Sequence, residues 1–273
     1  MRQCMKHFVI FWLALALVAS LPGFAAGASY QFSASAKASF DKMTGAASTS
    51  MKEQLISQYD LLQTYYKHEL EWEHKIKTIH ANNEGLEKKI RNQIQMLDNE
   101  RIKQLESDIA KLKKRYEPVI KMYDTQRNQL NMIKAVKTSN KELIKAMNIS
   151  VSISKAAADH AKTEIRRQEA NLKAARSTAN EKKKELRSML ADGAALTSKI
   201  KIAKSAIQAS NKQYTAEGKL LSQAVRQQAA SAALQSMRKM NGHAQAINKQ
   251  KSNIYSLEQQ YAQLLAKVQL RLK

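Results

Sequence analysis

A heptad pattern between residues 105 and 123 constrains the fold of this chain more than any other feature. Its apolar positions recur alternately four and three residues apart, and they are Leu105, Ile109, Leu112, Tyr116, Val119 and Tyr123. This spacing draws one continuous apolar stripe along an α-helix, and the stripe leaves water only when another helix covers it. The pattern therefore predicts a long helix that packs lengthwise against a second helix.

The composition favours helices over the rest of the chain as well. Of the 273 residues only two are Pro and seven are Gly, while Ala, Lys, Gln, Leu and Ser are abundant. Apolar stripes of similar spacing run through 55–79, 86–102 and 247–272. We therefore predict an all-α protein, either elongated antiparallel coiled-coil hairpins or a helical bundle, with five to six long helices.

The first 28 residues resemble an export signal. Arg2 and Lys6 precede an uncharged run of 14 residues, Phe8–Leu21, and small residues follow it. We expect cleavage after Ala28 and a protein that is secreted or resides in the cell-envelope space. A retained membrane anchor is the alternative, but the run is shorter than the roughly 20 residues that span a bilayer. The single cysteine, Cys4, would leave with the signal, so no disulfide is expected.

The mature chain divides into three predicted parts. Residues 29–48 are small and polar, and we expect a flexible lead-in in which Phe32 and Phe40 could fold back. Residues 49–147 are predicted to form a coiled-coil helical hairpin. Residues 148–273 are predicted to be a basic helical region rich in Ala and Lys. Heptad seams on helices this long often bury their stripe in a partner chain, which is consistent with a homo-oligomer.

Several sites are predicted to interrupt the helices. The segment Ala81–Gly85 reads as a turn between two antiparallel helices, because Asn and Gly tolerate left-handed backbone. Pro118 excludes a straight uninterrupted helix, and since the heptad phase continues across it, a kink or a joint is favoured over a hairpin. Further predicted breaks are 148–154, Asp192-Gly193, Gly218 and Asn241-Gly242.

The sequence offers no catalytic constellation. His68 and His74 flank a glutamate-rich stretch, but they are six residues apart, which places them on different helix faces, whereas a helical zinc motif needs four. Gly-rich phosphate loops and nucleophile elbows do not occur. Glu71 and His74 form a single Glu-x-x-His, whereas di-metal bundles need one on each of two helices. We therefore predict that the protein is not an enzyme and has no metal site, no cofactor and no small-molecule substrate.

Charge is the strongest compositional signal. The chain has 46 basic and 23 acidic side chains. The imbalance grows toward the C-terminus, where residues 193–273 hold 13 basic and only 2 acidic side chains. Such a gradient favours contact with a polyanion, because the self-repulsion needs to be screened. General solubility or a basic proteome is the alternative explanation.

Two basic clusters are candidate anion-binding sites. They are Lys111, Lys113, Lys114 and Arg115, and Lys182, Lys183, Lys184 and Arg187. The alternative is a solvated helix face, and it is stronger for the first cluster, because Glu106, Asp108 and Glu117 flank it. Aromatic residues do not interleave with either cluster, which argues against specific nucleic-acid binding.

These observations lead to three functional hypotheses. The first is a secreted, non-enzymatic coiled-coil protein that binds anionic envelope material, such as an anionic wall polymer or an acidic membrane surface. The second is a chaperone-like holdase or assembly factor for exported proteins. The third is a membrane-active helical toxin component, although the longest stretch free of Asp, Glu, Lys and Arg after the signal, 227–237, is short and weakly apolar.

Overall fold

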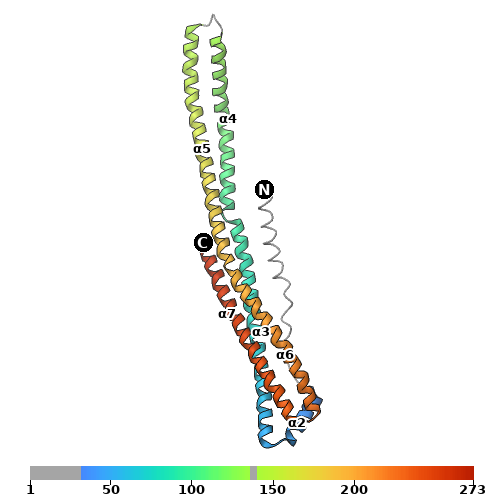
Figure 1. Cartoon of the computed structure of the whole chain (residues 1–273). Helices are drawn as coiled ribbons and strands as arrows, with labels where there is room; N and C mark the ends of the chain where they lie inside the picture. The colour runs from blue at the N-terminus through green and yellow to red at the C-terminus, as the bar shows by residue number, and fades with distance from the viewer. Residues whose placement is uncertain (1–31, 136–139) are drawn as a thin grey trace. The chain divides into compact units, whose positions relative to one another are not determined.

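The computed structural model describes residues 32–135 and 140–273, and these residues form helices with no strand among them (Figure 1). The helices are α2 Ala34–Ala46, α3 Thr49–Met96, α4 Asn99–Ala135, α5 Lys141–Ala191, α6 Gly193–Arg226 and α7 Ala230–Leu272. The all-α prediction is confirmed. The predicted signal peptide lies outside the described residues and stays a prediction.

The number of separate long helices is lower than the five to six predicted. Only Leu97 and Asp98 separate α3 from α4, and only Asp192 separates α5 from α6. These four helices therefore form two helical segments of about 87 residues each. The remaining helices are α7 and the short α2, which has 13 residues.

The chain folds into two compact units that are not consecutive in sequence. Unit 1 contains residues up to Glu87 together with Asp192–Lys267, and unit 2 contains Lys88–Ala191 together with Val268–Lys273. Each unit thus combines an early and a late part of the chain. The boundary expected from the sequence, between residues 147 and 148, falls inside α5. The predicted division of the chain stays a prediction.

In unit 1, α3 and α7 run parallel to each other. The side-chain amide of Asn241 donates to the carbonyl oxygen of Gln58 at 2.9 Å, and that of Asn248 donates to the carbonyl oxygen of Tyr65 at 3.0 Å. Rising residue numbers on α7 therefore meet rising residue numbers on α3, which defines a parallel pair. The stripe predicted in 247–272 accordingly packs against the first long helix.

The helix α6 runs antiparallel to α7 in the same unit. Residues 227–229 join the two helices, and Gln228 there has a left-handed backbone with φ 57°. The amide of Ala229 donates to the carbonyl of Ala224 at 2.9 Å and closes the last turn of α6. The ammonium of Lys239 meets Glu217 at 3.1 Å across the pair. Antiparallel packing, as the sequence predicted, thus holds for this pair.

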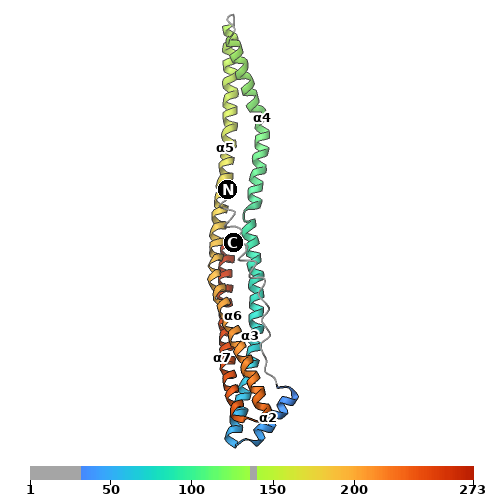
Figure 2. The same cartoon turned by 45° about the vertical axis from the view of Figure 1, so that its right-hand side comes forward.

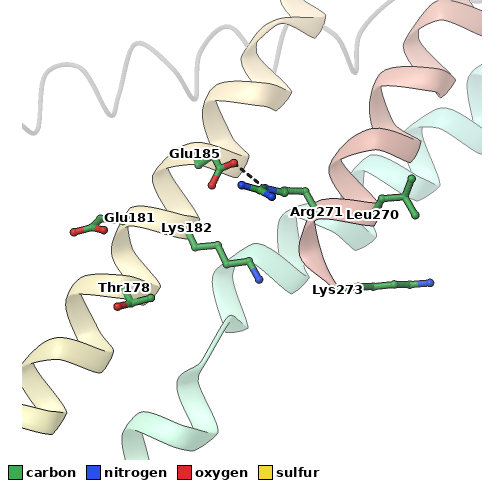
Figure 3. Close-up of a pocket in the computed structure, with 7 residues that line it drawn as sticks. All are labelled: Thr178, Glu181, Lys182, Glu185, Leu270, Arg271 and Lys273. Atoms are coloured by element: carbon green, nitrogen blue, oxygen red, sulfur yellow. Dashed lines mark hydrogen bonds and ion pairs between the residues drawn. The ribbon is translucent and has the colours of Figure 1, made fainter.

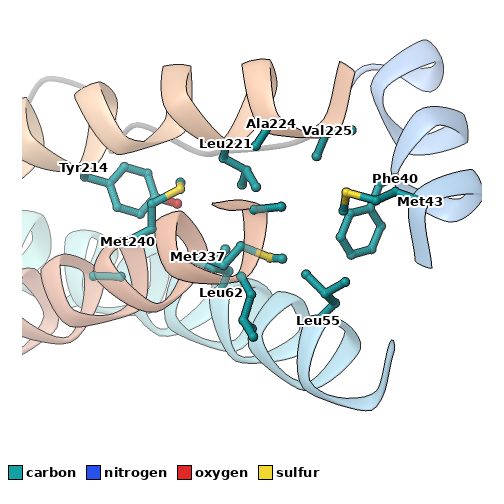
Figure 4. Packing of buried hydrophobic residues seen from close by; sticks show 13 residues of the cluster. Phe40, Met43, Leu55, Leu62, Tyr214, Leu221, Ala224, Val225, Met237 and Met240 are labelled. Carbon is teal, nitrogen blue, oxygen red and sulfur yellow. The ribbon is translucent and has the colours of Figure 1, made fainter. Parts of the chain in front are cut away.

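The core of unit 1 consists of two apolar clusters. One gathers residues of α2, α3, α6 and α7, and Phe40, Met43, Leu55, Leu221 and Met237 are among its most buried members (Figure 4). The other joins the next turns of α3, α6 and α7 through Ile76, Ile200, Ile207, Ile247 and Ile254. Both clusters are made by stripes with heptad-like spacing, which explains why three long helices share one narrow core.

The lead-in is more ordered than the sequence predicted. Residues 34–46 form α2, whose side chains Phe40 and Met43 are buried, and which packs on α6 (Figure 2). The Ser33 hydroxyl accepts a hydrogen bond from the amide of Ala36 at 3.2 Å and caps the helix. Phe32 and Phe40 do fold back: Phe32 stacks on Phe40 and on Tyr59, and the rings of Phe40 and Tyr59 are tilted relative to each other.

In unit 2, α4 and α5 form an antiparallel hairpin (Figures 1 and 2). Lys113 pairs with Glu169 at 2.6 Å, and Lys134 donates to Asn148 at 3.2 Å, so rising numbers on α4 meet falling numbers on α5. The predicted stripe of α4 faces inward, with Ile109 buried. The buried positions of α5 opposite it are mostly small, namely Ala158, Ala161, Ala175 and Ala179. Small side chains let the two backbones approach closely.

The turn predicted at Ala81–Gly85 is wrong, because α3 continues through it without a break. The local propensities of Asn and Gly are overridden by tertiary contacts. Asn83 is buried, and its amide donates to the backbone oxygen of Glu258 at 2.9 Å and to its carboxylate at 2.8 Å. A glycine inside a helix costs only about 1 kcal/mol, which such contacts outweigh.

Pro118 lies inside α4, which extends from Asn99 to Ala135, so a hairpin at this proline is excluded. The break that the sequence did not predict falls at Leu97-Asp98, where Asp98 has φ 58°. Asp is one of the few residues that adopt this left-handed conformation readily. The predicted break at Asp192-Gly193 is confirmed as a helix boundary.

The remaining predicted interruptions are wrong. Residues 148–154 belong to α5, Gly218 belongs to α6, and Asn241-Gly242 belongs to α7. Val151 and Ser154 lie on the inward face of α5, so packing holds the β-branched segment in helical form. The true turn at 227–229 consists of Gln-Gln-Ala, which carries no turn signature.

Gly193 allows the start of α6 to approach α7 closely. A Cβ atom at this position would clash with the ring of Tyr261 and would touch Leu264 at 3.3 Å. We expect Gly193→Ala to lower the free energy of unfolding by about 1–3 kcal/mol, as overpacking of a filled site does. Gly85→Ala and Gly242→Ala meet nothing within 4 Å and should raise it by about 0.5–1 kcal/mol. Urea denaturation followed by circular dichroism measures all three, and equal effects would contradict the close approach.

Candidate functional site

The first basic cluster is partly neutralised by neighbouring acids. Lys113 pairs with Glu169 of α5 at 2.6 Å, and Lys111 lies 3.8 Å from Asp108. Lys114 and Arg115 are exposed. Two of the four cations are therefore paired with acids, and one of these pairs, Lys113 with Glu169, joins α4 to α5.

The second basic cluster lies on α5, away from the first. Lys183 is half-buried and donates to the side chain of Asn99 at 3.2 Å, whereas Lys184 and Arg187 are exposed. Since Lys113 is level with Glu169, the clusters are about 14 residues apart along α5, or roughly 21 Å. The structure does not bring the two predicted clusters together.

Lys182 of this cluster lines a shallow depression beside the C-terminal end of α7 (Figure 3). The depression is lined by Thr178, Glu181, Lys182, Glu185, Leu270, Arg271 and Lys273. Arg271 donates to Glu185 at 2.9 Å. Acidic and basic groups are mixed here, so the depression does not favour an anion over a cation.

The most strongly basic surface belongs to α6 and α7 in unit 1. The two acidic residues of 193–273 are both engaged within the bundle: Glu258 is 2% exposed, and Glu217 meets Lys239 at 3.1 Å. The exposed cations of these helices are Lys199, Lys201, Lys212, Lys219, Arg226, Arg238, Lys239, Lys249 and Lys267. Lys239 is the one among them that pairs with Glu217, and the exposed surface of α6 and α7 in unit 1 therefore carries a large excess of positive charge.

A buried ion group joins α7 to α3. Lys251 is 1% exposed, and its ammonium meets Glu69 at 2.8 Å and Glu73 at 2.5 Å. An unpaired ammonium at this depth would be very unfavourable, so the two carboxylates are a requirement for its burial. The group fixes which residues of the two parallel helices lie opposite each other.

A second polar group surrounds Glu258. One carboxylate oxygen meets Nδ1 of His80 at 2.8 Å, and the other accepts from the amide of Asn83 at 2.8 Å. His80 Nε2 also lies 3.4 Å from Glu84. These contacts satisfy a carboxylate that the bundle otherwise removes from water.

The hydrogen bond that His80 donates to the carboxylate of Glu258 raises the pKa of His80 above its usual value, against the opposing effect of burial. The charges of Glu258 and Glu84 add to this rise, and the charge of Lys204 opposes it. Burial lowers the pKa of Lys204, while Glu258 and Glu84 act in the other direction. The contacts with Glu258 and Glu84 therefore stabilise the protonated imidazole relative to the neutral one.

Sequence reasoning missed both buried groups. In the sequence, His80 lies six residues after His74, which is again too far apart for a helical zinc motif, and Asn83 is part of the predicted turn at Ala81–Gly85. The available signal was compositional, because Glu258 is one of two acids in a strongly basic region and lies among the apolar positions of its helix. Lys251 gave the same positional signal, because it lies four residues after Ile247 and three before Ile254.

Residues 32–135 and 140–273 contain no group of three or more His, Cys, Asp or Glu side chains arranged to hold a metal ion. Within the same residues, no helix is both long enough and apolar enough to cross a membrane. Comparisons with protein-family models, with curated proteins and with solved structures gave no match.

Removal of Lys251 should destabilise unit 1 strongly. We expect Lys251→Met to cost about 3–5 kcal/mol of unfolding free energy, because it leaves Glu69 and Glu73 without their cation. The double variant Lys251→Met/Glu69→Leu should recover much of the loss. Lys249→Met, at an exposed position of the same helix, should change stability by less than about 0.5 kcal/mol. Chemical denaturation measures each value, and a similar loss for Lys249→Met would contradict the assigned role of the ion group.

The stability should also depend on pH through His80. Because the folded pKa is raised, the stabilisation is complete below the usual pKa of 6.5 and is lost as the pH rises through the folded pKa. The unfolding free energy of the natural protein should therefore fall relative to His80→Gln as the pH increases above about 6.5. His68→Gln, on the exposed side of the same helix, is the control and should leave the pH profile unchanged. Parallel profiles for the natural protein and His80→Gln would refute this.

Proposed function

We propose that this chain is a secreted, non-enzymatic coiled-coil protein that binds anionic envelope material through the basic surface of α6 and α7. The observation that supports this proposal most is that both acidic side chains of α6 and α7 are already engaged within the protein. Glu258 is buried and Glu217 pairs with Lys239, so among the described residues the other eight exposed cations of these helices in unit 1 make no ion pair. Folding thus concentrates a charge imbalance that the sequence already has.

Binding would arise from many weak contacts rather than from one pocket. Exposed lysines form single ionic contacts worth about 0.2–1 kcal/mol each, and these are screened at physiological salt. A multivalent anion adds such contacts along one surface, and it also relieves the repulsion between neighbouring lysines. A monovalent small anion would gain neither advantage.

The salt dependence of binding tests the proposal. We expect the full chain to bind inorganic polyphosphate or vesicles of acidic phospholipid, and to lose roughly 50-fold in affinity between about 50 mM and 200 mM salt if four cations are engaged. Fluorescence anisotropy with labelled polyphosphate and co-sedimentation with vesicles measure this. Neutral phosphatidylcholine vesicles are the control. An affinity that is the same at both salt concentrations, or no binding at all, would refute the proposal.

A holdase that clasps exported proteins is a second candidate, and one observation favours it. Large apolar side chains are exposed on the α4–α5 hairpin, namely Met132 (72%), Leu143 (48%), Ile149 (57%) and Ile153 (68%). Surfaces of this kind bind apolar segments of other proteins. Suppression of aggregation of a reduced, unfolded client without nucleotide would support this candidate, and Ile149→Ser/Ile153→Ser should then abolish it.

A further inference from the structure

Four cations form a row along one face of α6. They are Lys201, Lys212, Lys219 and Arg226, and we call them the α6 row. Their spacings are 11, 7 and 7 residues, and both spacings return to nearly the same side of an α-helix, with a drift of about 20° each. All four are exposed. The row therefore occupies a sector of about 40° and extends over 25 residues, or about 38 Å.

No acidic residue of α6 lies on the helix face that carries the α6 row. The positions between its members on this face are uncharged, for example Ser205, Gln208, Thr215 and Gln223. The one acid of α6, Glu217, lies about 160° around the helix from Lys219 and meets Lys239 of α7.

The row has no internal role in holding the bundle together. Among the described residues, no ion pair involves any of its four members. The helix packs into unit 1 through its opposite side, where Ile207, Tyr214 and Leu221 are buried. Cations of the row about 10 Å apart are near one screening length of each other, so they still repel at physiological salt. An external anion would relieve that repulsion.

We propose that the α6 row is the docking site of a linear, flexible polyanion that lies along the helix. This inference rests on the proposed function and assigns it to a specific face. A chain with closely repeated charges can supply one anion to each cation along the whole length of the row. Three of the four members are lysines, which act as point charges and suit such a sliding contact better than a bidentate one.

The same face is poorly suited to a lipid surface. A helix that lies in a membrane interface needs a free apolar side, whereas the apolar side of α6 is buried in the core of unit 1. The large apolar residues that α6 does expose are Ile202 and Leu220, which are 18 residues apart, or about 27 Å. The face also offers no aromatic ring on which a nucleic-acid base could stack, because Tyr214, the one aromatic residue of α6, is buried.

A charge-matched pair of variants tests the assignment. The row variant is Lys201→Gln/Lys212→Gln/Lys219→Gln/Arg226→Gln, in the full chain. The control variant removes the same charge from exposed positions of the α4–α5 hairpin outside both basic clusters, Arg127→Gln/Lys145→Gln/Lys155→Gln/Lys173→Gln. Glutamine is a good helix former, so both should keep the helical circular dichroism of the natural protein.

The measurement is anisotropy of labelled inorganic polyphosphate over a series of salt concentrations. We expect the row variant to bind at least tenfold more weakly and its slope of log affinity against log salt to fall by about 3. The control variant should lose less than threefold, with a slope change below about 1.

Each other outcome has a distinct meaning. Equal losses in the two variants would overturn the α6 row and leave salt-dependent anion binding, and hence the proposed function, in place. Binding of the natural protein to acidic vesicles but not to polyphosphate would overturn the polymer as the occupant and would favour a lipid surface. Failure of the natural protein to bind any anion at low salt would overturn the inference together with the proposed function.

Discussion

The structure depends on the lengthwise burial of narrow apolar stripes. The described residues include no disulfide or metal site, and each helix offers only a strip of apolar side chains between charged faces. Such strips become dry only when helices lie along one another over many turns. Long helices are the consequence, and so is the way each unit is assembled from distant parts of the chain. The positive charge lies on the helix faces that this packing leaves exposed.

Apolar stripes alone do not determine which turns of two helices face each other, because a shift by one heptad preserves the pattern. In unit 1 polar groups supply this information. Lys251 needs Glu69 and Glu73, and Glu258 needs His80 and Asn83. A shift of α7 along α3 would leave a buried charge without its partner, which is among the most unfavourable events in a protein interior.

Sequence reasoning succeeded where periodicity decides and failed where contacts between distant residues decide. The stripe from Leu105 to Tyr123 does face a partner helix, and the all-α class follows from the same evidence. The turn expected at Ala81–Gly85 is absent, because the hydrogen bond from Asn83 to Glu258, 175 residues away, stabilises the helix at this position. Conversely, the turn at 227–229 has no local signature and is imposed by the packing of α6 on α7. The basic region was visible in the composition, but the face on which its charges gather required the helix boundaries.

The parallel pairing of α3 with α7 has a consequence for the order of folding. Contacts within the α4–α5 hairpin join residues as few as 14 positions apart and can form one after another from its loop. In unit 1, Gln54 meets Arg238 and His80 meets Glu258, at separations of 184 and 178 residues. Unit 1 therefore cannot close until nearly the whole chain has been synthesised, and α3 must wait with its apolar stripe uncovered. A chain of this design has its longest period of vulnerability to aggregation before its last helix is available.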